Sequence, residues 1–491
     1  MADEIISLGR RLSQLAAERP NGPAVSDVDR TVTWRELDLR TNRLARGLQA
    51  AGVRQGDLVT VGLTNSVAFI EACYGLWKVG ATPQPISFRL PASEAEAVMA
   101  LAATPILIAG PQFDSTRPRF EVDQLMALSV DDSPVEDRIA PFYKAPTSGG
   151  STGRPKLILS GSPGVFAPPE GGGGGYRTSG EDTMLMPGPL YHNGPFTSSF
   201  AGLNQGAHLV VMPRFDAEET LRWIERHKAT WLYLVPTMMG RIWRLPDRVR
   251  YDVSSLRTVW HLAAPCPPWL KEAWIDWLGP DVIMELYAGT EAQAVTIITG
   301  AEWLSHRGSV GKVVIGEMAA FDTEGNLLPP GEVGEIFMRG PEGAAASYSY
   351  RGAEARTLPG GWESLGDIGS FDADGYLYLA DRRADMILVG GSNVYPAEIE
   401  AALDEHPLVQ SSAVIGMPDD DLGATIHAIV QPRPGLDEAM LREHVRARLV
   451  TYKQPRTYEF VEGNIRDDAG KVRRTQLRDE RLNVRPATGA Q

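Results

Sequence analysis

Cysteine is scarce in this sequence, which has only Cys73 and Cys266 among its 491 residues. Two thiols cannot build a disulfide framework, and their spacing matches no zinc site, so they fit a reducing compartment. Long apolar runs are also absent: no window of ~18 uninterrupted apolar residues occurs, so we expect no membrane span. The first residues include Asp3 and Glu4, where a signal peptide carries basic side chains, and we therefore expect a cytoplasmic protein.

Basic residues are also fewer than acidic ones. The chain has 48 basic and 62 acidic residues and a formal net charge of −14. This balance argues against general binding to nucleic acid or to anionic membranes, but it leaves room for a local basic site that binds phosphates. Apolar residues make up 43% and charged residues 22%, which is typical of globular proteins, and the length predicts two to four domains of ~100–200 residues.

Two common nucleotide-binding motifs are missing, since the chain contains neither a Walker loop nor a G-x-G-x-x-G fingerprint. Glycine itself is abundant: 50 residues exceed the usual share of ~7%, and they gather in clusters. One cluster lies in residues 147–156, which combine glycines, hydroxyl side chains and a lysine. Exposed N–H groups, hydroxyl donors and the charge of a lysine suit a phosphate-binding loop. Another cluster, residues 171–175, predicts a mobile loop, because consecutive glycines disfavour regular structure.

The 147–156 segment has a rival interpretation as the nucleophile elbow of a serine hydrolase, because residues 149–153 formally match G-x-S-x-G. That elbow requires a buried strand before the serine and a helix directly after it. Here Pro141 and Pro146 interrupt the preceding stretch, and Pro155 disfavours helical backbone at the residue before it. Both sides therefore argue against a hydrolase. A solvated linker is the remaining alternative for this segment taken alone.

Alternating helices and strands in the first 110 residues, and again at 207–240 and 256–286, predict βαβ units around a parallel sheet. We expect helices at 34–51, 67–79, 218–227 and 269–277, and strands at 57–63, 82–86, 208–212, 230–235 and 282–287. From 308 to 381, short strands between turn signals predict an antiparallel, barrel-like subdomain. A smaller α+β module follows, with strands expected at 386–389, 412–417 and 426–431 and helices at 397–405 and 438–449. The expected fold class is α/β, with a large N-terminal domain (1–381) and a small, mobile C-terminal domain (382–491).

Six further motifs follow the 147–156 loop in a fixed order over nearly the whole chain. They are Tyr287-Ala-Gly-Thr-Glu291, Gly366-Asp367, Asp381-Arg382, Gly390–Pro396, Tyr452–Pro455 and Gly470-Lys471. Together they resemble the adenylate-forming superfamily, which includes acyl-CoA synthetases, adenylation domains of peptide synthetases and luciferases. The resemblance implies an enzyme that couples a carboxylate to the α-phosphate of ATP, releases pyrophosphate, and passes the acyl group to a thiol. Because Lys471 and Glu291 are both present, an active enzyme is favoured over a nucleotide-binding protein without catalysis.

The resemblance also assigns roles. Thr290 would bind the α-phosphate, Glu291 would hold Mg²⁺, and Lys471 would bridge the carboxylate and the α-phosphate, while His192 would lie between acid and ATP. Tyr287 would stack on adenine, and Asp367 would accept hydrogen bonds from the ribose. The remaining residues expected at ATP or AMP are Thr147, Ser148, Gly149, Gly150, Ser151, Thr152, Gly153, Lys156, Ala263, Ala264, Pro265, Ala288, Gly289 and Arg382. Gly390, Gly391, Ser392 and Lys453 are expected on the CoA side.

Three places depart from the family pattern. Ala384 stands at the hinge, where the family usually carries Asp or Lys. Ala263 replaces a glycine in the motif that contacts adenine. Residues 160–180 form a Pro- and Gly-rich insertion, where the family commonly continues into a helix.

The acid pocket is expected to be large and apolar, without an Asp to bind the ammonium group of an amino acid. Its predicted residues are Pro195, Phe196, Trp231, Tyr233, Met238, Trp260 and His261. The runs 191–195 and 261–269 resemble ligases for bulky polycyclic acids such as bile acids and terpenoid acids. We therefore expect an acid:CoA ligase that uses ATP, Mg²⁺ and, as second substrate, coenzyme A. Fatty or aryl acids and a carrier-protein thiol remain alternatives, and a monomer and a homodimer are both compatible with the sequence.

Overall fold

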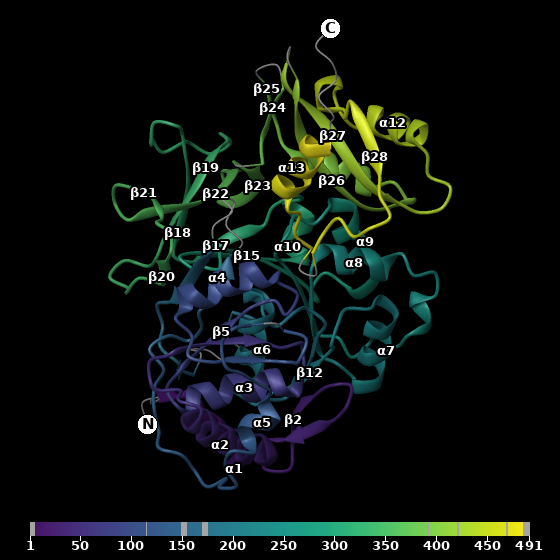
Figure 1. The fold of residues 1–491 in the computed structure, drawn as a ribbon. Helices are drawn as coiled ribbons and strands as arrows, with labels where there is room; N and C mark the ends of the chain where they lie inside the picture. Colours follow the sequence, from purple (N-terminus) through teal and green to yellow (C-terminus); the bar gives the residue numbers. More distant parts are fainter. Residues whose placement is uncertain are drawn as a thin grey trace.

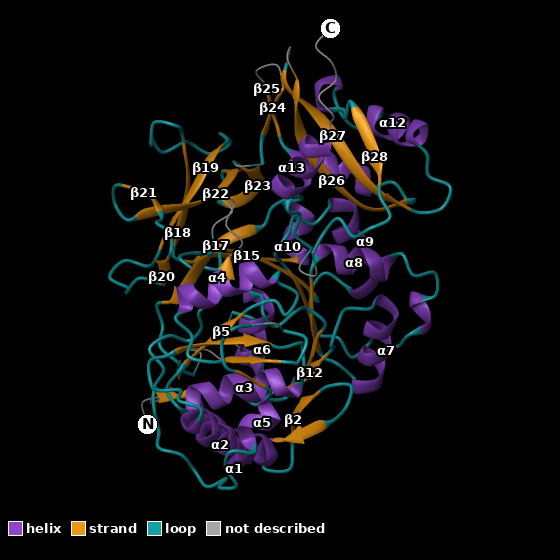
Figure 2. Ribbon diagram, viewed as in Figure 1, coloured by secondary structure: helices purple, strands orange, loops and turns teal. Residues whose placement is uncertain are grey.

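The computed structural model describes residues 5–113, 115–148, 155–168, 175–383, 385–389, 392–419, 422–467 and 470–484. Residues up to Arg382 form a large body, and the residues after it form a smaller part across one end of that body (Figure 1). Figure 2 shows helices packed around the strands of the body and a strand-rich region on one side, which residues 311–382 form.

A 14-stranded sheet runs through the body. Its hydrogen-bonded path is β18-β19-β22-β23-β17-β16-β15-β14-β13-β11-β12-β2-β3, and β21 pairs with β22. In chain order its strands are β2 (Pro23–Ser26), β3 (Thr31–Thr33), β11 (Thr183–Met186), β12 (His208–Val211), β13 (Trp231–Leu234), β14 (Thr258–His261), β15 (Ile283–Ala288), β16 (Val295–Thr299), β17 (Gly311–Ile315), β18 (Glu317–Phe321), β19 (Gly334–Arg339), β21 (Arg356–Leu358), β22 (Trp362–Phe371) and β23 (Tyr376–Arg382). The strands from β2 to β15 along this path pair in parallel, and those from β15 to β18 pair antiparallel.

Five smaller sheets complete the strand arrangement. Four parallel strands form the second sheet of the body, β4 (Leu58–Gly62), β5 (Thr82–Pro85), β6 (Leu107–Ala109) and β7 (Arg119–Phe120). Two short antiparallel sheets also belong to the body, β1 (Ile6–Ser7) with β10 (Val165–Phe166), and β8 (Thr147–Ser148) with β9 (Lys156–Ser160) and β20 (Tyr348–Arg351). The smaller part contains the pair β24 (Ile387–Val389) and β25 (Ser392–Val394) and the sheet β26 (Val409–Asp419), β27 (Gly423–Pro432) and β28 (Thr457–Phe460).

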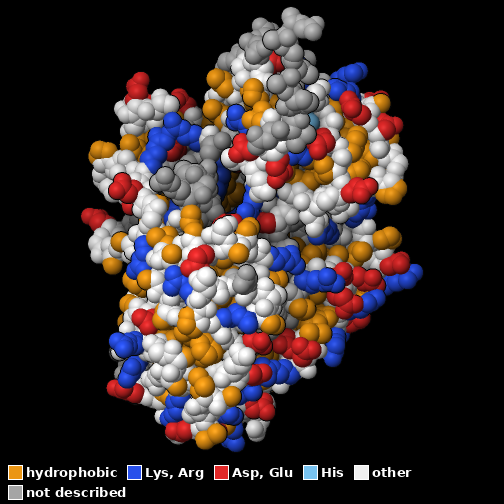
Figure 3. Space-filling model, in the orientation of Figure 1, with side chains coloured by type: hydrophobic (Ala, Val, Ile, Leu, Met, Phe, Trp, Pro, Cys, Tyr) orange, Lys and Arg blue, Asp and Glu red, His pale blue; other side chains and the backbone are white. Residues whose placement is uncertain are grey.

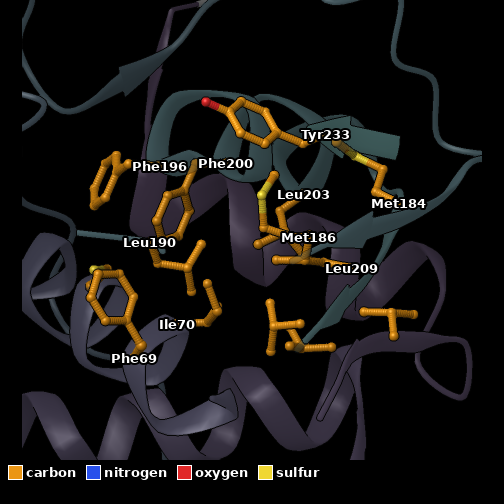
Figure 4. Close-up of a cluster of buried hydrophobic side chains, with 14 of the residues drawn as sticks. Phe69, Ile70, Met184, Met186, Leu190, Phe196, Phe200, Leu203, Leu209 and Tyr233 are labelled. Atoms are coloured by element: carbon orange, nitrogen blue, oxygen red, sulfur yellow. The ribbon is translucent and has the colours of Figure 1, made fainter. Parts of the chain in front are cut away.

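Helices cover both parts. In the body they are α1 (Leu8–Glu18), α2 (Trp34–Ala50), α3 (Val67–Lys78), α4 (Ala92–Ala102), α5 (Val122–Met126), α6 (Asn193–Gln205), α7 (Ala217–His227), α8 (Pro236–Trp243), α9 (Pro268–Leu278) and α10 (Gly300–Ser305). In the smaller part they are α11 (Pro396–Asp404), α12 (Glu438–Arg446) and α13 (Arg474–Val484). Figure 4 shows how α3 and α6 pack on β11 and β12 through Phe69, Ile70, Met184, Met186, Leu190, Phe196, Phe200, Leu203 and Leu209.

The expected helices and strands are confirmed to within a few residues. Helix 34–51 is α2, which begins with a capping box: Thr33 Oγ1 accepts the Glu36 N–H at 3.2 Å, and Glu36 Oε2 accepts the Thr33 N–H at 2.8 Å. Two expectations differ in extent. The predicted strands 412–417 and 426–431 lengthen into β26 and β27, and the antiparallel strands after residue 308 continue the hydrogen bonding of the large sheet.

Parallel strands place their carboxyl ends at one edge of the sheet. The segments that leave β11, β13, β14 and β15 therefore meet there, which carries His192, Thr237, Ala263 and Glu291 to neighbouring positions. In open α/β sheets, ligands bind at this edge. The fold thus brings together segments that lie about a hundred residues apart in the sequence.

A buried ion pair supports the strand that ends at this edge. Lys271 Nζ of α9 lies 2.5 Å from Glu285 Oε2 of β15, and their side chains are 1% and 7% exposed. His261 Nδ1 lies 3.9 Å from the other carboxylate oxygen. That ring stays neutral near pH 7, because desolvation lowers the pKa of His261 to about 4. Lys271 therefore supplies the positive charge for Glu285.

Replacing Lys271 by methionine is expected to destabilise the body, because the Glu285 carboxylate then stays buried without a cation. Breaking a buried pair in this way costs about 3–5 kcal/mol. Chemical denaturation followed by tryptophan fluorescence measures the change. Lys228→Met is the matched control, since Lys228 pairs with Asp252 at the surface, and it should leave the unfolding midpoint almost unchanged. Equal midpoints for the two variants would contradict this role of Lys271.

Candidate active site

A cleft of about 2720 Å³ lies where the carboxyl edge of the large sheet meets the smaller part of the chain. Figure 3 shows the surface hollowed in this region. Most of the predicted site residues line this cleft, namely Thr147, Lys156, His192, Pro195, Tyr233, Ala263, Ala264, Pro265, Tyr287, Ala288, Gly289, Thr290, Glu291, Asp367, Arg382 and Lys471. Eight predicted residues lie outside the described part: Gly149, Gly150, Ser151, Thr152, Gly153, Ala384, Gly390 and Gly391. Ser148 is the last residue of β8.

Asp367 is held from both sides by hydrogen-bond donors. The Tyr287 hydroxyl donates to Asp367 Oδ2 at 2.7 Å, and Arg382 Nε donates to Asp367 Oδ1 at 3.2 Å. Desolvation raises the pKa of Tyr287 well above its usual value, so this phenol remains a donor. The carboxylate is therefore oriented toward the cleft, where it can accept hydrogen bonds from paired hydroxyl groups.

Two small residues fix the backbone beside Tyr287. A Cβ on Gly289 would lie 2.2 Å from Leu365 Cδ1, so a side chain there would displace Leu365. Ala263 has a φ of 76°, a left-handed conformation in which glycine is at ease and alanine is strained. The departure noted from the sequence at Ala263 thus coincides with backbone strain at the wall of the cleft.

Glu291 lies at the centre of a small polar group. Tyr350 of β20 donates its hydroxyl to Glu291 Oε1 at 2.5 Å, and Lys156 Nζ lies 3.6 Å from the same oxygen. The lysine ammonium also lies 4.0 Å from the centre of the Tyr350 ring. Lys156, the lysine of the 147–156 segment, therefore reaches the carboxylate that was expected to hold a metal ion. Sequence reasoning missed Tyr350, which carries no motif.

A single buried carboxylate suits Mg²⁺, which is usually held by one or two protein carboxylates together with substrate phosphates and water. Among the residues that the structure describes, no cluster of three or more His, Cys, Asp or Glu side chains could hold a metal ion by itself. Glu291 therefore fits a Mg²⁺ ion that arrives with a nucleotide. In the same described residues, no helix is long and apolar enough to cross a membrane.

Lys471 enters the cleft from the smaller part of the chain. Its N–H donates to Asp467 Oδ1 at 2.9 Å, and its carbonyl accepts the Asp467 N–H at 2.9 Å. A Cβ on Gly470 would lie 2.9 Å from Thr237 Oγ1 of the body, so glycine permits this close approach. Desolvation and the charge of Arg382 lower the pKa of Lys471, while the carboxylates of Asp467, Glu291 and Asp367 raise it. Lys471 thus faces the acidic groups of the body.

His192 lies at the N-terminus of α6, and its ring packs beside that of Tyr191 at 4.6 Å. Desolvation, together with the charges of Lys471 and Arg473, lowers the pKa of His192 to about 3. The imidazole is therefore neutral at physiological pH. It can take part in hydrogen bonds, but it carries no charge toward an anion.

Five of the seven residues predicted for the acid pocket lie behind the cleft wall: Phe196, Trp231, Met238, Trp260 and His261. The two indole N–H groups of Trp231 and Trp260 each donate to the Tyr176 carbonyl at 2.8 Å, and the Tyr176 ring packs edge-on against the Trp260 ring. Phe196 packs against the aromatic rings of α3, and His261 faces Glu285. Tyr233 and Pro195 do reach the cleft, and Figure 4 shows the Tyr233 hydroxyl pointing away from the buried Leu and Met side chains.

Tyr176 follows directly on the glycine run that had no counterpart in the family pattern. Besides the two indole hydrogen bonds, its hydroxyl lies 3.1 Å from Thr197 Oγ1 of α6, and its ring lines the cleft. The described end of the 160–180 insertion therefore supplies part of the cleft wall. Only the tertiary contacts of Tyr176 reveal this position, because one tyrosine after five glycines has no motif of its own.

Two residues predicted for the CoA side, Ser392 and Lys453, do not line this cleft. Ser392 begins β25, and Lys453 Nζ lies 2.7 Å from both carboxylate oxygens of Glu398. Lys144, which the sequence analysis did not single out, lines the cleft.

Comparison with known proteins places the chain in a family. The family profile described as "AMP-binding enzyme" matches residues 12–349, and the profile "AMP-binding enzyme C-terminal domain" matches residues 398–471. A feruloyl-CoA synthase from Amycolatopsis sp. is 31% identical over 483 residues, which cover 94% of this chain and 96% of the relative. A 3-[(3aS,4S,7aS)-7a-methyl-1,5-dioxo-octahydro-1H-inden-4-yl]propanoyl:CoA ligase from Rhodococcus jostii is 29% identical and covers 98% of this chain and 100% of the relative.

Among solved structures, the o-succinylbenzoate CoA synthetase (MenE) from Bacillus subtilis in complex with its acyl-adenylate intermediate OSB-AMP is similar with a TM-score of 0.83. It is 26% identical, and the match covers 97% of this chain and 99% of that chain. The expected α/β class, with a large N-terminal domain and a small C-terminal domain, is thereby confirmed.

The low pKa of His192 leads to a prediction for the variant His192→Gln. Because the ring is already neutral well above pH 3, its loss should lower the rate of acid activation without changing the shape of the pH profile. Initial rates measured from about pH 5.5 to 9, the interval in which an unperturbed histidine would titrate, test this expectation. If the wild type shows an acid limb near pH 6 to 7 that the variant lacks, His192 titrates in that range and the assignment is wrong.

Proposed function

We propose that this chain, which belongs to the AMP-binding enzyme family, is an ATP-dependent acid:CoA ligase for a bulky carboxylic acid. One observation carries the proposal: Lys471 of the smaller part faces Glu291, Asp367 and Arg382 of the body across one cleft. Such a site combines a ribose acceptor, a metal carboxylate and a mobile cation. These groups suit the transfer of an adenylyl group to a carboxylate.

The proposed reaction has two steps. A carboxylate oxygen of the acid attacks the α-phosphorus of ATP, the bond to the β-phosphate breaks, and pyrophosphate leaves with acyl-AMP retained. The sulfur of a CoA thiolate then attacks the acyl carbon, and AMP leaves. Both nucleophiles are substrates, so the protein contributes position and charge. Lys471 would stabilise the negative charge that grows on the carboxylate and α-phosphate, and Glu291 would hold Mg²⁺ against the phosphates.

The acid side of the cleft supports a bulky, mostly apolar substrate. Its wall includes Pro195, Leu262, Tyr176 and Tyr233, and it opens into the large cleft shared with the nucleotide. The Rhodococcus jostii relative, matched over nearly its whole length, is named for a bicyclic propanoyl group. We propose a polycyclic terpenoid or steroid-like acid as the substrate class. The feruloyl-CoA synthase relative makes an aryl acid the second candidate.

The decisive experiment is ATP–pyrophosphate exchange with a panel of steroid-like, fatty and aryl acids, followed by mass analysis of the product with and without CoA. We expect the strongest exchange with a polycyclic acid and an acyl-CoA product. Exchange confined to aryl or fatty acids would replace the substrate class but keep the ligase. Exchange without CoA transfer would point to a carrier-protein thiol, and ester hydrolysis without ATP would overturn the ligase itself.

Lys471→Ala should abolish acyl-AMP formation while thioester formation from supplied acyl-AMP persists, because the lysine charge is needed where carboxylate and α-phosphate meet. Both half-reactions are measured on the same protein preparation. Lys228→Ala, an exposed lysine outside the cleft, serves as the control and should leave both rates unchanged. Equal loss of both half-reactions in Lys471→Ala would contradict the role given to Lys471.

A further inference from the structure

Lys144 is a buried cation whose position the proposed reaction does not yet use. Its side chain is 7% exposed and lines the cleft. The backbone on either side is fixed, since the Ala145 N–H donates to the Pro83 carbonyl at 3.0 Å and the Lys144 carbonyl accepts the Ser160 N–H at 3.0 Å. The ammonium group is therefore held at the wall rather than free to reach solvent.

Among the residues that the structure describes, the hydrogen-bond partner of the Lys144 ammonium is an amide. Its Nζ donates to Asn193 Oδ1, and Asn193 is the first residue of α6, directly after His192. No carboxylate forms an ion pair with Lys144 among the residues that the structure describes. Glu291 acts on it at longer range, but that carboxylate already accepts the Tyr350 hydroxyl and lies beside Lys156.

The other deeply buried lysines of the described chain behave differently. Lys78, 4% exposed, lies 2.6 Å from Asp38 Oδ1, and the fully buried Lys271 lies 2.5 Å from Glu285 Oε2. Each core lysine is thus given its counter-charge by the fold. Burying an ammonium without one is costly, and desolvation accordingly lowers the pKa of Lys144 to about 7. Because the described protein gives Lys144 no carboxylate partner and Lys144 lines the cleft, an anion bound in the cleft would supply the counter-charge.

We propose that Lys144 and the side-chain amide of Asn193 form a subsite that binds a carboxylate oxygen of the acid substrate. This proposal rests on the proposed function. Its chemistry follows from the position: His192 directly precedes α6, Pro195 lies in its first turn, and Tyr233 and Tyr176 also line the cleft. The phosphate side already has Lys156 beside Glu291. A carboxylate bound here would pair with the Lys144 ammonium, which has no carboxylate partner among the described residues.

The oxygen belongs either to the reacting carboxylate or to a second carboxylate of a diacid. Lys144→Met keeps the length of the side chain and removes the charge. We expect the KM for the acid in ATP–pyrophosphate exchange to rise about 10- to 100-fold, as for the loss of a hydrogen bond between charged groups. The KM for ATP should stay within about threefold, since binding of the phosphates is unaffected. A rise with every acid identifies the reacting carboxylate, and a rise with diacids alone identifies a second carboxylate.

Asn193→Asp provides an independent variant. It places a carboxylate of the protein beside Lys144, so the lysine gains the partner that the substrate would otherwise supply. The KM for the acid should rise as in Lys144→Met, while the thermal midpoint stays equal to or above that of the wild type. Lys228→Met is the control for the loss of one lysine charge and should change neither KM. An unchanged KM for the acid in both cleft variants, or a rise confined to ATP, would overturn the proposal.

A measurement without turnover separates this proposal from the proposed function. Reductive methylation of the wild-type lysines near neutral pH, quantified by peptide mass analysis, reports whether the Lys144 amine is covered. The acid should protect Lys144 and leave Lys228 reactive, and ATP alone should not protect it. If no acid supports exchange but an acid still protects Lys144, the ligase assignment fails and the subsite stands. If exchange proceeds and no acid protects Lys144, the subsite fails.

Discussion

Buried charge needs a counter-charge, and the source of that counter-charge divides this molecule into scaffold and site. In the core the fold supplies it: the fully buried Glu71 side chain of α3 lies 2.5 Å from Arg40 Nε of α2, and Lys271 of α9 meets Glu285 of β15. These pairs join one element to the next and hold the elements in place. In the cleft the pairing is incomplete, because the buried Lys144 has no carboxylate partner among the described residues and lines the space where anionic substrates would lie.

The same principle shapes the junction between the two parts of the chain. Asp381, at the end of β23, accepts the N–H of Arg382 and, at 2.8 Å, the N–H of Ala397 in the first turn of α11. Within the smaller part, the Glu400 carboxylate pairs with the guanidinium groups of Arg466 at 2.9 Å and of Arg474 at 2.8 Å. Lys471 lies between these two arginines in the sequence. Charged contacts thus link the hinge to the lysine. The position of Lys471 also depends on packing, because Gly470, the residue before it, lies close to Thr237 of the body.

Much of the fold could be read from local patterns. The apolar spacing of α2 and its Thr33–Glu36 capping box depend on neighbours a few residues apart, as do the buried runs of β13 and β15, so their boundaries were predictable. The motif residues that line the cleft were equally visible, because backbone and charge requirements at a nucleotide impose residue types at fixed places. The lining of the cleft was less visible: Trp231 and Trp260 have the composition expected of an apolar wall, yet neither lines the cleft, and their indole N–H groups donate to the Tyr176 carbonyl.

What the sequence determined by itself is the class of chemistry and the strands and helices that bear it, since both depend on residue types and on short-range spacing. The tertiary structure alone decided which side chains line the cleft. Burial of a residue on a strand depends on what packs over it, and here that is the end of a glycine-rich insertion with no motif. The same holds for Lys144, whose significance lies in a missing carboxylate. A counter-charge comes from residues distant in the chain, so its absence becomes visible only when the chain is folded.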